Sequence, residues 1–373
     1  MKIKKGKYIG ISIFLLIWLG NLMLFSPFKD ESSKVCSLKP STGEISIITP
    51  ENKTYYNAMS GYYPASYGFE NDRDGSFPTG WSVLDAGGTA NIISELDGHK
   101  KVLEIHDTSA LEMEIINSFT DKTNGTIEFF IRCANNTKRT KFFIYDEEDT
   151  DAVYLYFDND GYIKYYDTVT HNIMQYNSSQ WYHLKIEWDC AVGDWYLWID
   201  GISQDSGSGY NLRGNPTALD TLYIGTTTTE QDFYSYIDAV GYSWDPNYEI
   251  GDNLEEGLLL SFESSIDSEW MGYSFDGQTN KTILGNSTIP MSNYGIHTIQ
   301  VFGNETSGTM YSSELRYFTT HLPEFHIDKQ IAIGSSEPFD PESIKFKDGI
   351  YDETTFGGGF GEVFHREHAD TVI

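Results

Sequence analysis

The sequence predicts an all-β protein with two β-sandwiches of unequal size and one N-terminal transmembrane helix. Its 373 residues exceed one ordinary domain. Aromatic residues make up 15% of the chain, and such side chains fit the half-buried surface of a strand. Short apolar runs are joined by Asp-Gly pairs, for example at 160–161 and 200–201, and this combination is a strong hairpin signal.

The N-terminus is predicted to be an export signal. Four lysines within 1–7 precede an uncharged apolar run at 8–25, which is just long enough to span a bilayer as a helix. We expect residues 1–28 to be a signal anchor, because no A-x-A cleavage site is visible, with a cleaved signal peptide as the alternative. The lysines place the remainder outside the cell. The chain is therefore expected at the cell surface as a single-pass membrane protein with an extracellular C-terminal part, or secreted if the signal is cleaved.

Seven N-x-S/T sequons agree with this extracellular location. They lie behind an export signal, and most fall in turn-like surroundings. Glycans are expected at Asn52, Asn124, Asn135, Asn177, Asn280, Asn286 and Asn304.

The charge and the cysteines exclude several kinds of partner. A net charge of −30 repels nucleic acid and anionic lipid, whereas it suits a solvated surface protein or one that binds calcium. Cys36, Cys133 and Cys190 lack the spacing of a zinc site. Cys133 and Cys190 each close a predicted strand. A disulfide between them stays open, although antiparallel neighbours would hold those two ends apart.

After a polar stalk at 29–43, the segment 64–250 carries a distinctive strand pattern. A W-x-H motif at 181–183 opens one strand, and a hairpin leads to a second strand that closes in D-G at 200–201. This pattern resembles the laminin G-like, concanavalin A-like jelly roll, and P-T-G-W at 78–81 resembles the opening of jelly-roll carbohydrate-binding modules. The resemblance implies a jelly-roll β-sandwich and leaves its ligand open.

Residues 255–320 carry a different pattern. Their Y-S-x-D-G motif at 273–277 and G-x-H-x-I-x-V motif at 295–301 are similar to the small immunoglobulin-like β-sandwich repeats of prokaryotic, especially archaeal, surface proteins. Such repeats open with I-x-I-x-x-P-x-N-x-T-Y, which stands far upstream at 45–55. The resemblance implies a discontinuous domain, 44–58 plus 255–320, with the jelly roll inserted. The alternative is that 44–58 is a stalk strand and the two domains are consecutive.

We predict no catalytic residues. Glycanases that share the jelly roll place two or three carboxylates at alternate positions of one strand. Glu112 and Glu114 alternate in this way, but the family's E-x-D-x-E pattern is missing. His365 and His368 lack the spacing of a zinc protease and stand in a stretch, 321–373, that is predicted to be an irregular tail. The chain is therefore expected not to be an enzyme.

Calcium is the cofactor that the sequence favours. Glu70, Asp72 and Asp74 crowd into one turn, and hard cations bind clustered oxygens. The carbohydrate-binding jelly rolls that this chain resembles hold a structural calcium between the first strand and an Asp of the last strand, and Glu70 and Asp238 occupy matching places. We expect a metal site of Glu70, Asp72, Asp74 and Asp238. The alternative is an acidic turn plus an unrelated strand-end Asp.

Aromatic side chains are the candidates for stacking on a sugar. Trp188, Trp195 and Trp198 are the obvious ones, but alternation puts Trp195 and Trp198 on opposite faces, and which face is core stays open. The leading hypothesis is a cell-surface adhesion or glycan-binding protein. Its partners would be glycans or other surface proteins, and it would contact the membrane through its N-terminal helix. The alternatives are a passive structural envelope component and an extracellular glycanase.

Overall fold

The computed structural model describes residues 43–55, 61–146, 148, 150–227, 231–291 and 294–320, and the course of four short strands beyond them. The regular secondary structure in these ranges consists of strands, apart from one short 3-10 helix, η1 (Asp252–Leu254). No helix in these ranges is long and apolar enough to cross a membrane. The predicted signal segment, 1–28, and nearly all of the predicted stalk, 29–43, lie outside the described residues.

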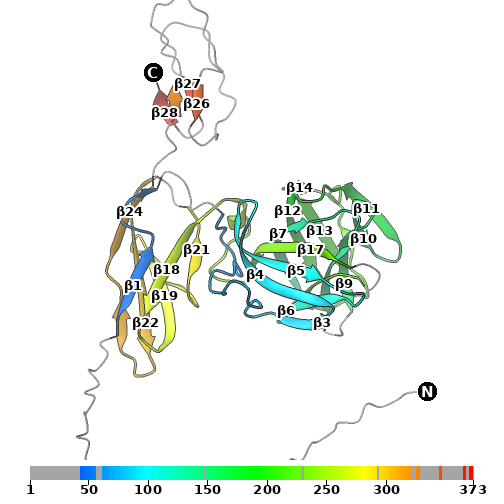
Figure 1. Ribbon diagram of the computed structural model, residues 1–373, viewed down its shortest axis with the longest axis horizontal. Coiled ribbons are helices and arrows are strands. Elements are labelled where there is room, and N and C mark those ends of the chain that lie inside the picture. Colours follow the sequence, from blue (N-terminus) through cyan, green and yellow to red (C-terminus); the bar gives the residue numbers. More distant parts are fainter. Residues whose placement is uncertain are drawn as a thin grey trace, which may run out of the picture. The chain divides into compact units, whose positions relative to one another are not determined.

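The segment predicted as a jelly roll forms two antiparallel sheets. One has seven strands in the order β11 (Thr170–Gln175), β10 (Tyr162–Tyr166), β9 (Asp151–Phe157), β8 (Thr140–Asp146), β16 (Leu219–Gly225), β6 (Met113–Lys122) and β3 (Ser82–Ala86). The other has β14 (Ile202–Ser203), β13 (Asp194–Ile199), β12 (Trp181–Asp189), β7 (Asn124–Cys133), β17 (Phe233–Tyr242), β5 (His99–Asp107) and β4 (Gly88–Leu96), and β15 (Tyr210–Asn211) pairs with β13. Figure 1 shows β4, β5 and β17 running side by side in the second sheet.

Alternate side chains of both sheets fill the core between them. Leu155 and Phe157 of β9 pack with Phe142 of the same sheet and with Phe129 and Ile131 of β7, and all five are almost completely buried. Alternation of this kind is what the pleat of a strand imposes. The all-β sandwich that the sequence predicts is therefore present.

The tryptophans of the W-x-H hairpin divide between two environments. Trp188 and Trp195 are 1% and 2% exposed and belong to the core, together with Leu197. Trp198 lies on the other face of β13, where the Nζ atom of Lys185 stands 3.8 Å from its ring centroid. Trp188 and Trp195 therefore cannot stack on a ligand at the surface, and only Trp198 retains that role.

The two cysteines of this sandwich are far apart along their strands. β7 and β12 are antiparallel, with Asn124 opposite Asp189. Cys133 ends β7 and Cys190 directly follows β12, so they lie at opposite ends of the strand pair. The register thus holds their Cα atoms beyond the reach of a disulfide.

The remaining strands up to residue 320 form a smaller sandwich. One sheet contains β1 (Ile45–Thr49), β18 (Leu258–Ser264) and β21 (Ser287–Ile289). The other contains β2 (Thr54–Tyr55), β24 (Arg316–Thr320), β22 (Gly295–Glu305), β19 (Ser268–Phe275) and β20 (Lys281–Thr282), and β23 (Met310–Ser312) pairs with β22.

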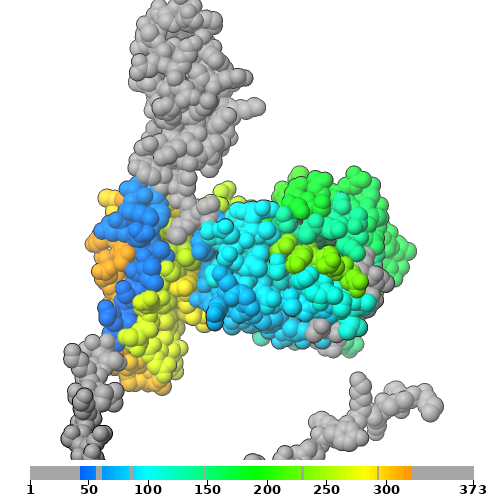
Figure 2. All heavy atoms as spheres, in the orientation of Figure 1, coloured from blue at the N-terminus to red at the C-terminus, as the bar shows by residue number. Residues whose placement is uncertain are grey.

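β1 and β2, which precede the larger sandwich in sequence, belong to this smaller sandwich. β1 runs antiparallel to β18, with Ile45 opposite Ser264, and β2 runs parallel to β24. Ile45 and Ile47 enter the same core as Leu258 and Leu260. Figure 2 shows the blue residues of β1 against the yellow and orange residues of the later strands. The segment that precedes the larger sandwich in the sequence and the segment that follows it thus share one core.

Short strands also occur within 321–373, where an irregular tail is predicted. β25 (Phe325–Ile327) pairs with β26 (Ile344–Phe346), and β27 (Phe364–Arg366) pairs with β28 (Ala369–Val372). Of the two histidines considered there, His365 falls within β27 and His368 lies outside the described residues.

Candidate ligand-binding face

The outer face of the seven-stranded sheet, which points away from the core, carries a row of aromatic side chains. Their strand neighbours Phe142, Leu155 and Ile163 point inward, so alternation sends the intervening residues outward. We call this surface the tyrosine face and define it by Phe143 and Tyr145 of β8, Tyr154 and Tyr156 of β9, Tyr166 of β10 and Tyr223 of β16.

The rings of the tyrosine face touch one another across the strands. Phe143 lies opposite Tyr154 on one side and opposite Tyr223 on the other, with ring centroids 4.3 and 4.7 Å apart. Tyr154 continues the row to Tyr166 at 5.6 Å and to Tyr156 at 5.3 Å. These separations are typical of attractive aromatic pairs. Four adjacent strands therefore carry one continuous array of rings. Phe143, Tyr156 and Tyr223 are buried within it, and Tyr145, Tyr154 and Tyr166 are half-buried and form its accessible part.

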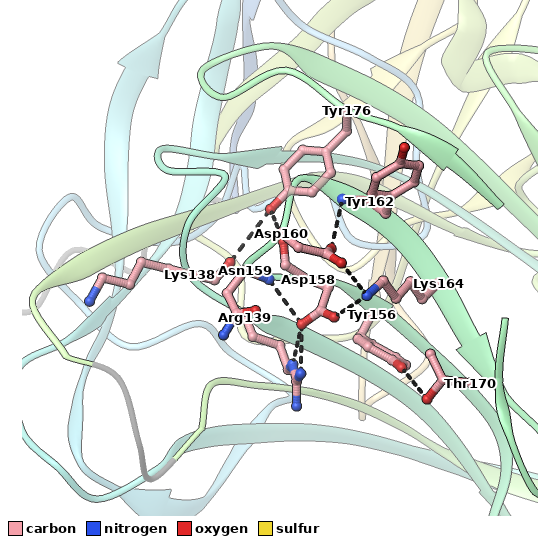
Figure 3. Close-up of polar contacts among 10 residues, drawn as sticks. All are labelled: Lys138, Arg139, Tyr156, Asp158, Asn159, Asp160, Tyr162, Lys164, Thr170 and Tyr176. Carbon is pink, nitrogen blue, oxygen red and sulfur yellow. Dashed lines mark hydrogen bonds and ion pairs between the residues drawn. The ribbon is translucent and has the colours of Figure 1, made fainter. Parts of the chain in front are cut away.

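A cluster of charged groups borders this array at the turn between β9 and β10. Figure 3 shows Lys164 and Arg139 converging on the Asp158 carboxylate. The Nζ atom of Lys164 lies 2.6 Å from Asp158 Oδ2 and 2.6 Å from Asp160 Oδ2, and Arg139 donates to Asp158 Oδ1 at 2.6 Å. The hydroxyl of Tyr176 donates to the backbone carbonyl of Asp158 at 3.0 Å, which anchors the turn.

The same basic groups lie near the rings. The Arg139 guanidinium carbon is 5.1 Å from the centroid of Tyr156, and β10 places Lys164 opposite Tyr156. Arg213 lies 4.8 Å from the centroid of Tyr166 and forms an ion pair with Asp151. Cations over ring faces gain about 0.5–1 kcal/mol at exposed sites, so these contacts help to hold the rings in place.

A second charged cluster borders the array on the side of β6. Lys141 lies 3.0 Å from Glu112 and 3.6 Å from Glu114, and the Tyr223 hydroxyl donates to Glu114. The Nζ atom of Lys141 stands 5.6 Å from the centroid of Phe143. The alternating carboxylates that the sequence singles out therefore share one ammonium group.

Ionisation of the first cluster is favoured by its own contacts. Burial acts to raise the pKa of the Asp158 carboxyl, but hydrogen bonds from Lys164 and Arg139 outweigh burial and hold this pKa below its usual range. Burial acts to lower the pKa of Lys164, and its two carboxylate partners raise it overall. Both groups are therefore charged at neutral pH.

The four residues predicted to bind calcium are engaged in other contacts. Asp238 is 2% exposed, and its Oδ2 lies 2.8 Å from the Nδ1 of His99. Asp72 accepts a hydrogen bond from the Thr79 hydroxyl at 2.6 Å, and Asp74 lies 2.8 Å from the Nζ of Lys101.

Asp238 nevertheless affects the ionisation of Glu70. Glu70 accepts a hydrogen bond from the Thr288 hydroxyl. Burial raises the pKa of Glu70 to about 7, and the charge of Asp238 contributes to the increase. Burial raises the pKa of Asp238 well above its usual range. In the part of the chain that the structure describes, no group of three or more His, Cys, Asp or Glu side chains is placed to hold a metal ion. Calcium binding stays a prediction.

The predicted glycosylation sites differ in accessibility. Asn52, Asn124, Asn177 and Asn280 are exposed, whereas Asn135, Asn286 and Asn304 are half-buried. The amide oxygen of Asn286 accepts the backbone N–H of Phe262 at 3.2 Å. That of Asn304 is buried and has no hydrogen-bond partner among the described residues.

Sequence reasoning missed the tyrosine face. The signal is the Y-L-Y-F run of β9 and the F-F-I-Y run of β8, in which aromatic residues alternate with core residues. For Asp160-Gly161 the sequence predicts only a hairpin turn. In the structure Asp158 and Asp160 form that turn, and in addition they hold the basic groups that border the rings.

Comparisons with known proteins give remote, partial likenesses. No protein family and no curated protein matches the sequence. Among solved structures, a sialidase is 14% identical with a TM-score of 0.39, and the match covers 45% of this chain and 17% of the sialidase. The carbohydrate recognition domain of Emp47p is 12% identical with a TM-score of 0.32, and the match covers 49% of this chain and 95% of that domain. A tetrameric galectin from the ball sponge Cinachyrella sp. is 10% identical with a TM-score of 0.27, and the match covers 34% of this chain and 98% of the galectin. The chain is similar to these proteins over part of its length, and a likeness this remote assigns it no activity.

Proposed function

We propose that this chain is a cell-surface glycan-binding protein and that the tyrosine face is its binding site. The observation that carries the proposal is the row of half-buried rings of Tyr145, Tyr154 and Tyr166, backed by the buried rings of Phe143, Tyr156 and Tyr223, with ion pairs at both borders. Sugars present apolar C–H faces that pack on aromatic rings and hydroxyl groups that hydrogen-bond to charged side chains. The array offers both kinds of contact on one surface.

Particular residues suit each kind of contact. Tyr145, Tyr154 and Tyr166 are only partly buried, so their rings remain open to a stacking ligand. Asp160, whose side chain is 50% exposed, can accept a sugar hydroxyl while Lys164 donates to another. The phenol groups of the tyrosines add further donors and acceptors.

Binding without catalysis is the activity that we propose. A retaining or inverting glycanase needs one carboxyl group that gives up a proton and a second that attacks or activates water. Glu112 and Glu114 both lie against Lys141. The alternating carboxylates are thus engaged in ion pairs, which supports binding as the proposed activity.

Display at the cell surface is part of the proposal. The lysine-flanked apolar run at 8–25 would anchor the chain, and the acidic composition suits a solvated extracellular protein. Adhesion then follows from a glycan-binding face held outside the membrane.

A glycan array probed with the full chain in detergent tests the function. Tyr154→Ala should weaken binding to the best array ligand at least tenfold, which corresponds to about 1.4 kcal/mol. Tyr196→Ala is the matched control, because Tyr196 is a half-buried tyrosine on the outer face of the other sheet. Absence of binding to every glycan, or equal losses in the two variants, would contradict the proposal. Absence of all binding would favour the passive envelope role.

A further inference from the structure

We propose that the tyrosine face selects uncharged glycans and discriminates against sugars that carry a carboxylate. This inference rests on the proposed function and adds the class of ligand. It comes from the distribution of charge around the rings.

Each basic side chain beside the rings already has an acidic partner. Lys164 lies 2.6 Å from two carboxylates, and Lys141 lies within 3.6 Å of two others. Arg139 pairs with Asp158, and Arg213 pairs with Asp151. The cations of this surface are therefore neutralised before a ligand arrives.

The acidic groups of the face outnumber the basic ones. The cations are Lys141, Arg139, Lys164 and Arg213, and their carboxylate partners are Glu112, Glu114, Asp151, Asp158 and Asp160. Figure 3 shows Lys138 reaching away from the Asp158 cluster, so its ammonium group does not offset this excess. The described part of the face thus carries a small net negative charge within a chain of net charge −30.

The affinity of this surface for a ligand carboxylate should be low. To reach Lys164 the carboxylate must displace Asp158 or Asp160, which leaves that group unpaired, or remain beside both with like charge. A hydroxyl group avoids both costs, because it donates to a carboxylate and accepts from an ammonium or guanidinium group without altering the charge balance. The pairing itself therefore acts as a filter on ligand charge.

The test compares two probes that differ in one group. The full chain is titrated calorimetrically with a neutral hexose tetrasaccharide chosen from the array and with the same tetrasaccharide bearing one uronic acid. At low salt the neutral sugar should bind at least tenfold more tightly. The difference should shrink in 0.5 M salt, because screening weakens repulsion.

Two variants with the same change in charge locate the effect. Asp160→Asn removes one carboxylate from Lys164 and should reduce the neutral-to-acidic affinity ratio at least threefold. Glu187→Gln removes an exposed carboxylate from β12, on the outer face of the other sheet, and should leave the ratio unchanged. If Asp160→Asn fails to fold, Lys164→Gln serves instead, and the ratio should then increase.

The outcomes separate this inference from the function on which it rests. Equal or tighter binding of the acidic sugar overturns the charge filter and leaves glycan binding intact. An equal change of ratio in Asp160→Asn and Glu187→Gln also overturns it, because the discrimination would then come from overall charge. Lack of binding to either tetrasaccharide, and to the array, overturns the proposed function itself.

Discussion

At the scale of single residues, Asp158 connects the turn of β9 and β10 to two basic side chains. Its side chain is 6% exposed, and it accepts hydrogen bonds from both Lys164 and Arg139. A paired carboxylate in such a position is costly to remove, because its partners remain charged and partly buried. Asp160 contacts the same lysine from a position that is 50% exposed, where an ion pair contributes little.

We expect Asp158→Asn to lower the free energy of unfolding by about 2–3 kcal/mol at pH 7. Asp160→Asn should lower it by less than about 1 kcal/mol. Urea unfolding of both variants measures the two losses. Equal losses would show that Asp158 has no special structural role.

The pH dependence of that loss has a definite sign. The pKa of Asp158 is held below its unfolded value, near 3.8, so the folded state prefers the ionised form. The contribution is fully present above the unfolded pKa and disappears as pH falls through the folded pKa. The difference between wild type and Asp158→Asn should therefore be constant from pH 5 to 7 and shrink below pH 4.

At the scale of elements, the strands could be predicted from the sequence. Which face of each strand points into the core could not. The apolar runs and Asp-Gly turns indicate β9 and β10 well. In β9, however, Tyr154 and Tyr156 alternate with Leu155 and Phe157, and both sets are apolar enough to be core. Only the position of the opposing sheet decides which set is buried between the sheets. For the same reason the sequence left open whether Trp195 or Trp198 faces the core.

Two substitutions in neighbouring positions of β9 should separate folding from binding. Leu155→Ala opens a cavity in the core and should lower the free energy of unfolding by about 2–5 kcal/mol. Tyr154→Ala should cost less stability, because its ring packs on the outer face, and should abolish most of the glycan affinity. Thermal denaturation and calorimetry give the two quantities. The reverse pattern would mean that the faces of β9 are misassigned.

The candidate site was harder to predict than the strands, for a physical reason. Phe143 and Tyr154 come from consecutive strands, but Tyr223 comes from β16, which is distant in sequence and adjacent to β8 in the sheet. Their contact depends on strand order and register, which local patterns do not specify. Asp72 and Asp74 are conspicuous because they stand close together in the sequence. In the structure, however, Asp72 contacts Thr79 and Asp74 contacts Lys101.

At the scale of the whole molecule, Glu70 should impose a pH dependence on stability. Its pKa is raised from 4.5 to about 7, chiefly by burial, so the folded state retains a proton that the unfolded chain releases. Stability should decrease as pH rises from 4.5 to about 7, by roughly 2–3 kcal/mol, and then level off. Glu70→Gln should reduce this slope and leave the part that comes from Asp238, whose pKa is also raised by burial. Urea unfolding at several pH values measures it, and an unchanged slope would contradict the assignment.

Bound calcium would oppose the decrease of stability with rising pH. An ion shared by Glu70 and Asp238 requires both carboxylates to be ionised, so it would stabilise the folded state most above pH 7. We expect the melting temperature at pH 7.5 to increase with calcium concentration and to decrease with chelator. Identical melting curves under the two conditions would contradict the calcium prediction.

The pairing of β1 with β18 and of β2 with β24 has a mechanical consequence. Tension applied between residues 43 and 320 enters the smaller sandwich at β1 and leaves it at β24. The larger sandwich is inserted between β2 and β18. While the strands of the smaller sandwich stay paired, the backbone of the larger sandwich therefore carries none of the applied force. A tethered chain under shear can thus keep its tyrosine face undistorted until the smaller sandwich unfolds. The larger sandwich would then become part of the stretched chain and lengthen it.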